Sequence, residues 1–543
     1  MRHAFLCIVL LFVLPLQAQR WNWAVDAGGG GNTDFCFGIA TDSHGNVYWA
    51  GSVSGTADLG CATISSSIAG CLAKYDSTGA CQWVRGITVG FNEAWAYGIA
   101  IDAQDRIYIT GSYDGNATFS NGVTLNSIGS DDIFLARYDT EGNCLWARRA
   151  GTTANDETRG IAVSPEGDVF ITGFAGGNPI TFDTISIANP SNWRQVVVAR
   201  YDSTGALHWA KATTSAFQFQ PRTGRGISVA NDRLYVTGQI GPQAATFDGL
   251  SITDGSSGQG MYVLACDLDG HALWAHMYGN GDHEGMGIAA DTLGDLFVVG
   301  RIDGSLQLLG DTLTSVSSDD DIVVMGLDTA GYIRWARSTG SADRDLAWGV
   351  EADGLGNAYI GGQFEDDVDF FGVPISAVGE EDLFLARMTN WGQLTWVKPG
   401  GSFQRDVGLC VHRGGIGAHP IYSGGYYWGP VTYGNSTIDD VQNGDAMLIG
   451  ASDTVSVDVP TAVGAGTAID GPSLFPSPAD DRITVRTGVS IVRAFTVSTT
   501  GAVVPLHLDA SGEGDVRRLA PGLYVLRLQL ADGRWTSRTF MKD

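Results

Sequence analysis

Residues 131–146 (DDIFLARYDTEGNCLW) form the phrase that the rest of this chain repeats. Residues 133–138 are a short and mostly apolar run, and residues 139–142 are rich in the residue types that tight turns use. Leu145 and Trp146 then open a second short run. Two such runs joined by a turn that contains glycine predict a β-hairpin.

Copies of this phrase recur at a nearly constant interval. The tryptophans that close the copies lie at positions 23, 83, 146, 209, 274, 335 and 396. A fixed period predicts a repeat architecture. A second recurring phrase lies between each tryptophan and the next hairpin, for example residues 98–102 (GIAID) followed by 107–111 (IYITG). Each period is therefore expected to hold four short strands.

Tandem four-stranded units without any helical pattern are typical of the blades of a β-propeller. The strand cores are apolar on both faces, as expected where each blade lies between two others. The alternative architecture is a chain of separate β-sandwiches. Each sandwich would then have only about half of the roughly 100 residues of an ordinary sandwich domain, which favours the propeller.

The number of blades follows from the two ends of the repeat region. Six full periods run from Trp23 to Trp396, and a seventh unit follows without its tryptophan strand. Residues 21–25 (WNWAV) match residues 144–148 (CLWAR) and have no preceding hairpin partner. We therefore predict an all-β fold with a seven-bladed propeller over residues 19–451, closed by the N-terminal strand, which hides the edges of the sheets.

The remaining segments have distinct compositions. Residues 1–18 combine Arg2, an apolar run and a small residue at position 18, which predicts a secretory signal peptide. The apolar run is too short for the roughly 20 residues of a membrane-spanning helix, and no later segment qualifies, so no transmembrane helix is expected in the mature chain. Residues 452–471 are predicted to be a linker, and residues 472–543 a small C-terminal β-sandwich.

The C-terminal segment resembles the sorting domain of the type IX secretion system. The shared features are the opening of residues 474–480 (LFPSPAD), the segment 519–524 (LAPGLY) and a basic residue near the end, with Phe475 and Ser477 in place of the more usual Tyr and Asn. The residues that carry the motif are Phe475, Pro476, Pro478, Gly522, Tyr524 and Lys542. The resemblance implies that the type IX secretion machinery is a partner and that the protein is secreted or held at the cell surface, with this domain removed.

The repeats resemble SBBP-type β-propeller repeats over roughly residues 30–450. The shared phrase has the form GIAVD, then GNVYITG, then DIFLARYD before a turn glycine. That resemblance implies a fold and brings no catalytic residues.

Charge and cysteine content narrow the partners and the covalent links. The chain has 59 acidic and 32 basic residues and a net charge of −27, so nucleic acid is not expected as a partner. After loss of the signal peptide, seven cysteines remain. Cys61 and Cys71 bracket one loop and are predicted as a possible disulfide. Cys81 and Cys144 lie two residues before their tryptophans and are expected to fill the core.

Motifs for catalysis are not found in the sequence. There is no nucleophile elbow, no His-Glu-x-x-His, no P-loop and no Cys-x-x-Cys pair, so no catalytic residue is predicted and no cofactor is evident. The histidines, His283 included, are expected in turns or at the surface. Turns such as residues 42–46 resemble calcium loops only in part, because they lack the ligand spacing of an EF-hand. Calcium remains a possible cofactor.

The residues just before each Gly-Ile phrase are predicted to line the rim of the central channel. They belong to the face that also carries the long loops 112–132, 173–194, 238–260 and 362–382, where binding usually resides. Six blades contribute acids and the fourth contributes arginines: Asp34, Glu93, Asp156, Glu157, Arg222, Arg225, Asp282, Glu284, Asp343, Asp345 and Asp406. Our hypothesis is a negative channel mouth that binds a cation or a cationic or hydroxyl-rich ligand. The alternative is that these are ordinary solvated loop carboxylates.

Two classes of function remain open. The favoured one is a secreted or cell-surface binding or adhesion scaffold for an unknown glycan or protein ligand. The alternative is a propeller enzyme acting on polysaccharide or peptide, which would need converging carboxylates or a metal at the channel mouth. A structural surface protein is a further alternative.

Overall fold

The computed structural model describes two separate stretches of the chain. The first is residues 20–452, apart from 30, 32–33, 91, 216–221, 243, 254–258, 280, 309–310, 415–419 and 440–443. The second is residues 473–542, apart from 476–481, 487–490, 499–502, 507, 510–511, 520–521 and 531–534. The chain divides into two compact units, Met1–Ser456 and Val457–Asp543. The predicted signal peptide lies outside the described residues, as does the predicted linker except for Ser452.

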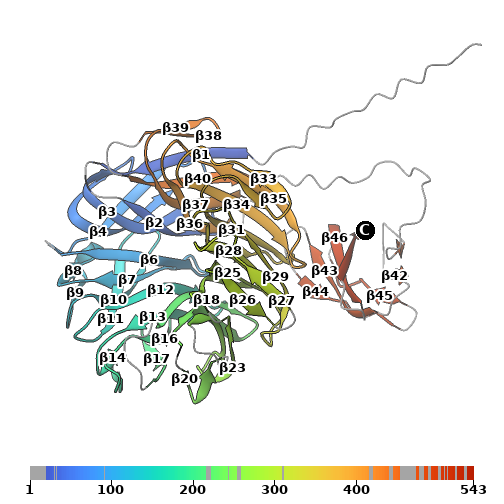
Figure 1. Cartoon of the computed structure of the whole chain (residues 1–543), viewed down its shortest axis with the longest axis horizontal. Coiled ribbons are helices and arrows are strands. Elements are labelled where there is room, and N and C mark those ends of the chain that lie inside the picture. The colour runs from blue at the N-terminus through green and yellow to red at the C-terminus, as the bar shows by residue number, and fades with distance from the viewer. Residues whose placement is uncertain are drawn as a thin grey trace, which may run out of the picture. The chain divides into compact units, whose positions relative to one another are not determined.

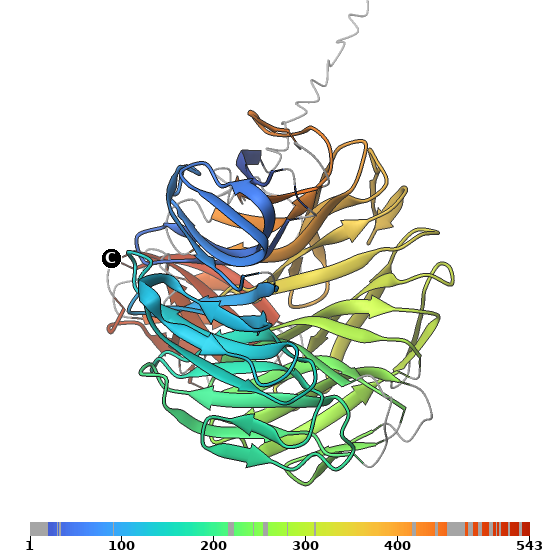
Figure 2. The same ribbon diagram turned by 90° about the vertical axis from the view of Figure 1, so that its left-hand side faces the viewer.

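The first unit is a ring of seven antiparallel blades of four strands each, and one of the seven sheets is extended by two further short strands (Figures 1 and 2). The innermost strands are β2 (Phe35–Thr41), β6 (Ala94–Ile101), β12 (Asp156–Val163), β18 (Arg222–Ala230), β24 (Glu284–Ala290), β30 (Leu346–Ala352) and β36 (Asp406–Arg413). The second strands are β3 (Val47–Asp58), β7 (Ile107–Tyr113), β13 (Val169–Ala175), β19 (Arg233–Ile240), β25 (Leu296–Ile302), β31 (Asn357–Phe364) and β37 (Pro420–Tyr427).

The outer half of each blade is the hairpin of the repeated phrase. The third strands are β4 (Thr63–Tyr75), β10 (Asp132–Tyr138), β16 (Gln195–Tyr201), β22 (Gly260–Asp267), β28 (Asp321–Leu327), β34 (Asp382–Thr389) and β40 (Asp445–Ser452). The outermost strands are β5 (Cys81–Ile87), β11 (Cys144–Gly151), β17 (Leu207–Ala212), β23 (Ala272–Tyr278), β29 (Ile333–Thr339), β35 (Leu394–Gly400) and β1 (Arg20–Ala27). The fold class predicted from the sequence is therefore confirmed.

The N-terminal strand completes the last blade. Strand β1 pairs antiparallel with β40, with Trp23 opposite Gly450 and Ala24 opposite Ile449. The seventh sheet thus has the order β1-β40-β37-β36, so it combines strands from both ends of the repeat region. Closure by the N-terminal strand is confirmed, and it pairs the outer edge of β40, which would otherwise be open.

The repeated tryptophan links one blade to the next. The indole N–H of Trp83 donates a hydrogen bond of 3.1 Å to the carbonyl oxygen of Thr140, in the hairpin turn of the following blade. Equivalent bonds join Trp23 to Ser77, Trp146 to Ser203, Trp209 to Leu268, Trp274 to Thr329 and Trp335 to Asn390. The turn glycine is required for this contact, because a Cβ on Gly142 would lie 3.0 Å from the Trp83 ring.

The long loops between the second and third strands are more regular than expected. Six blades carry a short hairpin there: β8–β9 (Asn116–Thr118 and Thr124–Asn126), β14–β15 (Ile180–Phe182 and Ile185–Ile187), β20–β21 (Ala245–Phe247 and Leu250–Ile252), β26–β27 (Ser305–Leu308 and Asp311–Thr314), β32–β33 (Val368–Phe370 and Val373–Ile375) and β38–β39 (Val431–Tyr433 and Ser436–Ile438). Strand β14 pairs with β11, so this hairpin lies against the outermost strand of the preceding blade. These long loops therefore share one element.

The predicted disulfide is wrong. Cys61 bonds to Cys81, with an S–S distance of 2.06 Å, and Cys71 is a buried free cysteine inside β4. The loop that carries Cys61 reaches the start of β5, where Cys81 lies, whereas the side chain of Cys71 is held in the core of the sheet. Cys81 is half-buried and packs against the core of this blade, while Cys144 is buried as expected.

The second unit has two small sheets. One contains β41 (Ser473–Phe475), β42 (Arg482–Arg486) and β45 (Glu513–Asp515), and the other contains β44 (Val503–Pro505), β43 (Ile491–Ser498), β46 (Gly522–Leu530) and β47 (Trp535–Lys542). Ile483, Val516, Leu526 and Phe540 are among its buried core residues. The predicted small β-sandwich is confirmed.

The residues of the sorting motif are only partly described. Pro476 and Pro478 lie outside the described residues, Phe475 ends β41 and Gly522 begins β46. Tyr524 is buried and stacks on Phe540, and Lys542 is the last residue of β47. The assignment to the secretion system stays a prediction. Among the described residues, no helix has the length and apolar character needed to cross a membrane.

Candidate ligand-binding site at the channel mouth

Every innermost strand carries a β-bulge at the same place. The pairing register shifts between Ala96 and Gly98 in β6 and between Thr158 and Gly160 in β12, and equivalent shifts occur in the other five blades. Six of these bulges end in glycine, because the innermost strands of neighbouring blades nearly touch. A Cβ on Gly160 would lie 2.7 Å from the carbonyl oxygen of Arg225. A bulge re-aims side chains, and here it turns the residue before the glycine into the channel.

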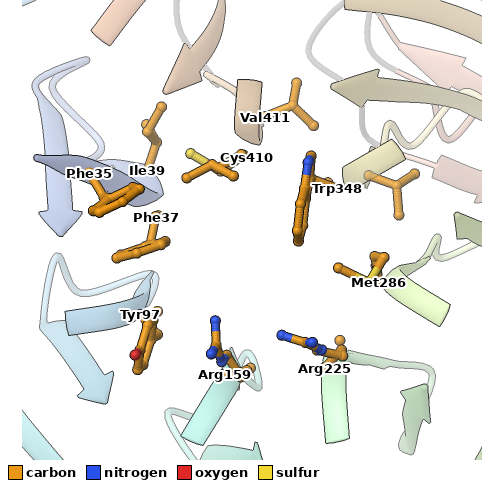
Figure 3. A pocket seen from close by; sticks show the side chains of 18 of the residues that line it. Phe35, Phe37, Ile39, Tyr97, Arg159, Arg225, Met286, Trp348, Cys410 and Val411 are labelled. Atoms are coloured by element: carbon orange, nitrogen blue, oxygen red, sulfur yellow. The ribbon is translucent and has the colours of Figure 1, made fainter. Parts of the chain in front are cut away.

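The residues that follow the bulges narrow the channel to an apolar floor. Each blade contributes one β-branched side chain to it: Ile39, Ile99, Ile161, Ile227, Ile288, Val350 and Val411. Figure 3 shows Ile39 and Val411 among the side chains that surround the opening. Because every blade places a β-branched residue in this ring, the Gly-Ile phrase recurs in the sequence.

The bulge residues themselves form a wall above the floor, and they vary between blades, with arginine in two of the seven. They are Phe37, Tyr97, Arg159, Arg225, Met286, Trp348 and Leu409. Floor and wall enclose a pocket of about 600 Å³. This volume lies within the range of small-ligand sites.

One side of the pocket is aromatic. Phe35 stacks on Phe37 at a centroid distance of 5.2 Å, and Trp95 stacks on Tyr97 at 6.1 Å with an angle of 5° between the rings. Phe37 and Tyr97 are in turn 5.0 Å apart, which joins the two pairs into one surface. The indole N–H of Trp95 donates to Glu93, and this bond fixes the orientation of its ring.

The adjacent side is formed by two arginines from neighbouring blades. Figure 3 shows Arg159 and Arg225 extending toward the centre of the opening, next to Tyr97. Arg159 lies 4.1 Å over the Tyr97 ring, and its Nε donates to Glu157. The Nε of Arg225 donates to Glu284 at 2.7 Å. Within the described part of the chain, the terminal nitrogens of both guanidinium groups have no protein hydrogen-bond partner.

Buried carboxylates hold these arginines in place. Burial raises the pKa of Glu284, but Arg225 and Arg301 outweigh that effect and hold it below the usual value, so Glu284 is ionised. Arg301 also pairs with Asp282 and with Asp320. The result is a fixed network that leaves the outer edge of Arg225 free to bind a ligand.

The predicted rim residues are divided between three environments, and only Arg225 lines the pocket. Glu93 and Asp343 are exposed, and Glu157 and Asp282 are half-buried. Asp34, Asp156, Arg222, Asp345 and Asp406 are fully buried, and Glu284 is nearly so. The continuous ring of exposed charges that we expected is therefore wrong. The innermost strands begin three or four residues before the residue that ends the bulge, so alternate residues in this stretch point between the blades and not into the channel.

His283 is also buried, and not in a surface turn as expected. It occupies the place that Asp156 has in the third blade, and burial lowers its pKa. The turns that resembled calcium loops bond internally: the Asp42 carboxylate accepts the main-chain N–H groups of His44 and Asn46. No group of three or more His, Cys, Asp or Glu side chains suited to a metal occurs among the described residues.

One carboxyl pair lies at the edge of the pocket. Glu381 lines the pocket and faces Glu365. Burial and the Glu381 carboxylate raise the pKa of Glu365 to about 7. A carboxyl group with this pKa can take up or release a proton near neutral pH.

Sequence reasoning missed most of the pocket. The aromatic residues and Trp348 were not singled out, since nothing marked the bulge before each glycine. The available signal was variation: the residue before the glycine is Phe37, Tyr97, Arg159 and Trp348 in four copies whose flanking residues are alike. In a ring of equal blades, positions that vary between copies and face the channel are the ones free to serve a ligand.

Comparison with known proteins supports the repeat. The family described as SBBP, a β-propeller repeat, matches residues 23–55. These residues are thus similar to an SBBP repeat. An uncharacterised WD repeat-containing protein of Acanthamoeba polyphaga mimivirus is 28% identical over 201 residues, which cover 33% of this chain and 14% of that protein. The regulatory protein FlaEY of Caulobacter vibrioides is 25% identical over 281 residues, covering 48% of this chain and 29% of that protein. The chain thus spans less than a third of either relative.

Solved structures with a similar arrangement share little sequence. The WD40 domain of Neurospora crassa Pan2 has a TM-score of 0.35 and 11% identity, covering 66% of this chain and 89% of that one. A polysaccharide lyase, an ulvan lyase, has a TM-score of 0.36 and 9% identity, covering 79% of this chain and 95% of that one. Such values carry no functional argument.

Proposed function

We propose that this protein is a secreted or cell-surface binding scaffold that seats an acidic sugar unit of a glycan in the central pocket. The observation that carries the proposal is the aromatic surface of Phe37 and Tyr97 placed beside Arg159 and Arg225. Aromatic rings offer a flat apolar face, and guanidinium groups bind carboxylate or sulfate through two parallel hydrogen bonds. A pocket of about 600 Å³ has room for one or two sugar rings.

The sign of the charge in the pocket separates this proposal from our first hypothesis. Four arginines line the pocket (Arg159, Arg225, Arg344 and Arg405) against one acid, Glu381. Their partners Glu157, Glu284, Asp320 and Glu380 engage one side of each guanidinium group. An acidic ligand can bind the remaining side, whereas a cation would meet the arginines first.

A glycan array followed by calorimetry tests the proposal. Oligosaccharides that contain uronic acid or sulfate are expected to bind, and neutral ones of the same length to bind at least about tenfold more weakly. Replacing Arg159→Gln and Arg225→Gln together is expected to abolish that preference. The matched control, Arg334→Gln with Arg337→Gln on the outermost strand β29, should bind as the wild type does. Unchanged binding by the pocket variant would contradict the proposal.

Export through the type IX secretion system is part of the same proposal. It is supported by the motif residues of the C-terminal segment and by the separate, compact second unit. A chain that ends at Ser452 is expected to fold and to keep its ligand affinity, but to stay inside its host. Efficient surface display of that shortened chain would contradict export by this route.

A polysaccharide- or peptide-cleaving enzyme is the second candidate, and one observation favours it. Glu365, with its raised pKa, lies against Glu381 at the pocket, so a proton donor is available beside a bound ligand. If ligand is cleaved, Glu365→Gln should stop cleavage while leaving binding intact. If the Glu365→Gln variant kept both cleavage and binding, this candidate would be ruled out.

A further inference from the structure

Buried aspartates face one another across four of the seven junctions between blades. In each case the first residue of a third strand meets a residue at the start of the innermost strand of the next blade. The pairs are Asp132 with Asp156, Asp321 with Asp345, Asp382 with Asp406, and Asp445 with Asp34. All eight residues are at most 1% exposed.

Main-chain hydrogen bonds bring the members of each pair together. The N–H of Asp156 donates to the carbonyl oxygen of Asp131, which precedes Asp132, at 2.8 Å. The same bond forms from Asp345 to Asp320, from Asp406 to Glu381 and from Asp34 to Gly444, at 2.7, 2.7 and 3.0 Å. The four junctions therefore have one shared geometry.

Aspartate at these positions occurs only in pairs. The equivalent residues at the other three junctions, by strand register, are Ala69 with Ala94, Gln195 with Arg222, and Gly260 with His283. No junction places one aspartate opposite a neutral side chain. If each strand needed its aspartate for a separate reason, the two aspartates would not occur together at the same junctions. The pair is therefore the functional unit.

A glycine makes room for each pair. A Cβ on Gly151 would lie 2.5 Å from Oδ1 of Asp132 and 3.0 Å from Oδ2 of Asp156, so both carboxyl groups border one small gap. Gly340, Gly401 and Gly28 have the same place beside Asp321, Asp382 and Asp445. At two junctions without an aspartate pair, the residue at this place is Thr88 or Thr214.

Asp156 and Asp345 accept hydrogen bonds on both carboxylate oxygens. In every pair, however, at least one member has a carboxyl oxygen without a protein partner among the described residues. Oδ2 of Asp132 accepts the N–H of Ile128 at 2.6 Å, and Oδ2 of Asp321 accepts that of Val316 at 2.8 Å. Among the described residues, the other oxygens of Asp132, Asp321 and Asp382 have no hydrogen-bond partner, and neither do Oδ1 of Asp406 and Oδ2 of Asp34. Two buried carboxylates so close together cannot both stay ionised without a counter-charge.

Few charged groups face the pairs. Arg149 lies 4.0 Å from Asp132 and Asp131 is its neighbour, while Asp320 and Glu365 act on the Asp321 pair. Tyr433 bonds to Asp406, and the thiol of Cys71 lies near Asp34. Leaving Asp445 aside, Arg149 is the sole Lys or Arg in ion-pair range of these carboxyl groups within the described ranges. The surroundings therefore supply no adequate counter-charge.

We propose that each of the four pairs is a binding site for one proton, held in a hydrogen bond between the two carboxyl groups. The pair then carries one negative charge, which the main-chain N–H groups stabilise, and the shared hydrogen bond ties one blade to the next. Loss of the proton places two like charges in a dry gap and weakens the junction. The ring is therefore tightened by mild acid and loosened by alkali.

The pKa values agree in direction. Burial, with a contribution from the paired carboxylate, raises the pKa of Asp34 to about 8 and those of Asp156, Asp345 and Asp406 to about 7. Burial also raises the pKa of Asp132 and of Asp321 to about 6. Because folded-state values exceed the unfolded value of 3.8, this stabilisation is complete below the unfolded pKa and is lost as pH rises through the folded ones.

The test uses the mature full-length chain and an amide that imitates the shared proton. In Asp132→Asn, Asp321→Asn, Asp382→Asn and Asp445→Asn combined, each side chain keeps an acceptor oxygen and offers an N–H to its partner at every pH. The wild-type melting temperature is expected to fall by about 5 °C or more between about pH 5 and about pH 9. The melting temperature of the variant should fall by less than half as much. At the higher pH the variant should therefore be more stable than the wild type.

A matched control removes four exposed acids: Asp58→Asn, Asp319→Asn, Asp367→Asn and Asp439→Asn. It should keep the wild-type dependence on pH, and an equal slope in both variants would overturn the proposal. Infrared spectra of the wild type provide a test that needs no variant. At about pH 6, where ordinary carboxyl groups are ionised, a carboxylic-acid C=O band should persist, and its absence would overturn the proposal.

Adding a metal salt distinguishes a site for a proton from a site for a metal cation. At about pH 9, calcium or sodium is expected to raise the melting temperatures of the wild type and the four-asparagine variant equally, through general screening. If calcium instead restored the stability of the wild type alone, the pairs would be metal sites and the proton assignment would be wrong.

Discussion

The indole N–H of Trp83 donates to the carbonyl oxygen of Thr140, 57 residues later in the chain, and the Trp83 ring covers the turn glycine Gly142. The hairpin turn of one blade is thus the docking surface for the outermost strand of the blade before it. Trp23, Trp146, Trp209, Trp274 and Trp335 make the equivalent bond. This contact explains why tryptophan and the turn glycine recur together at a fixed spacing.

Replacing the turn glycine should therefore destabilise the protein more than its backbone conformation alone implies. Gly142 has a φ of +81°, and a Cβ there would also meet the Trp83 ring. We expect Gly142→Ala to lower the free energy of unfolding by about 1 kcal/mol through backbone strain and by about 1–3 kcal/mol more through overpacking. The control is Gly249→Ala, with φ of +82° and no atom within 4 Å of the added carbon. Equal losses on chemical denaturation would refute the docking role.

Strand β1 should be essential for the whole ring. Its pairing with β40 completes the seventh blade, so deletion of residues 19–27 exposes the edge of β40 and the Trp23 contact surface at Ser77. We expect a large drop in melting temperature, seen in a single transition. Removing the second unit after Ser452 is the control, and it should leave the melting of the ring unchanged. A β1 deletion that melts like the intact chain would contradict closure.

Ligand binding should weaken as the pH rises through neutrality. The pKa of Glu365 is raised to about 7 by burial and by Glu381, which lines the pocket. Below that pH Glu365 is protonated and neutral, and above it a second negative charge lies beside the pocket and repels an acidic ligand. Calorimetry should give a Kd several-fold higher at about pH 8 than at about pH 6. Glu365→Gln should remove the difference, and a dependence of opposite sign would rule out an acidic ligand.

The disulfide in the first blade can be checked chemically. A peptide map without reduction should contain Cys61 linked to Cys81, and Cys71 should be alkylated only after unfolding, since it is fully buried. Replacing Cys61→Ser and Cys81→Ser should cost about 3 kcal/mol of stability, because the bond closes a loop of 20 residues. A link between Cys61 and Cys71 would disprove this arrangement.

The fold was predictable because each blade repeats the same local pattern. The tryptophan spacing, the turn glycines and the unpaired strand around Trp23 were sufficient for seven blades and for ring closure. The disulfide was not predictable, since both Cys71 and Cys81 are close to Cys61 in sequence and only the packing of β4 decides between them. The hairpins such as β8–β9 were missed because strands of three residues leave no clear periodicity.

The site was harder to predict because a bulge changes which side chains of a strand face the channel. Around the bulge before Gly160, Arg159 points into the channel while Asp156, at the start of β12, is buried in the junction between blades. A bulge leaves no mark in composition or charge. Pairing across blades, as between Asp132 and Asp156, was equally hidden, because it joins residues that only the closed ring brings together.

A crystal structure of the ring with an acidic oligosaccharide selected on the array tests the central claim most directly. We predict a sugar ring stacked on Phe37 or Tyr97, with its carboxylate or sulfate within hydrogen-bond distance of both Arg159 and Arg225. An oligosaccharide bound on the outer hairpins such as β14–β15, with the central pocket vacant, would contradict the account.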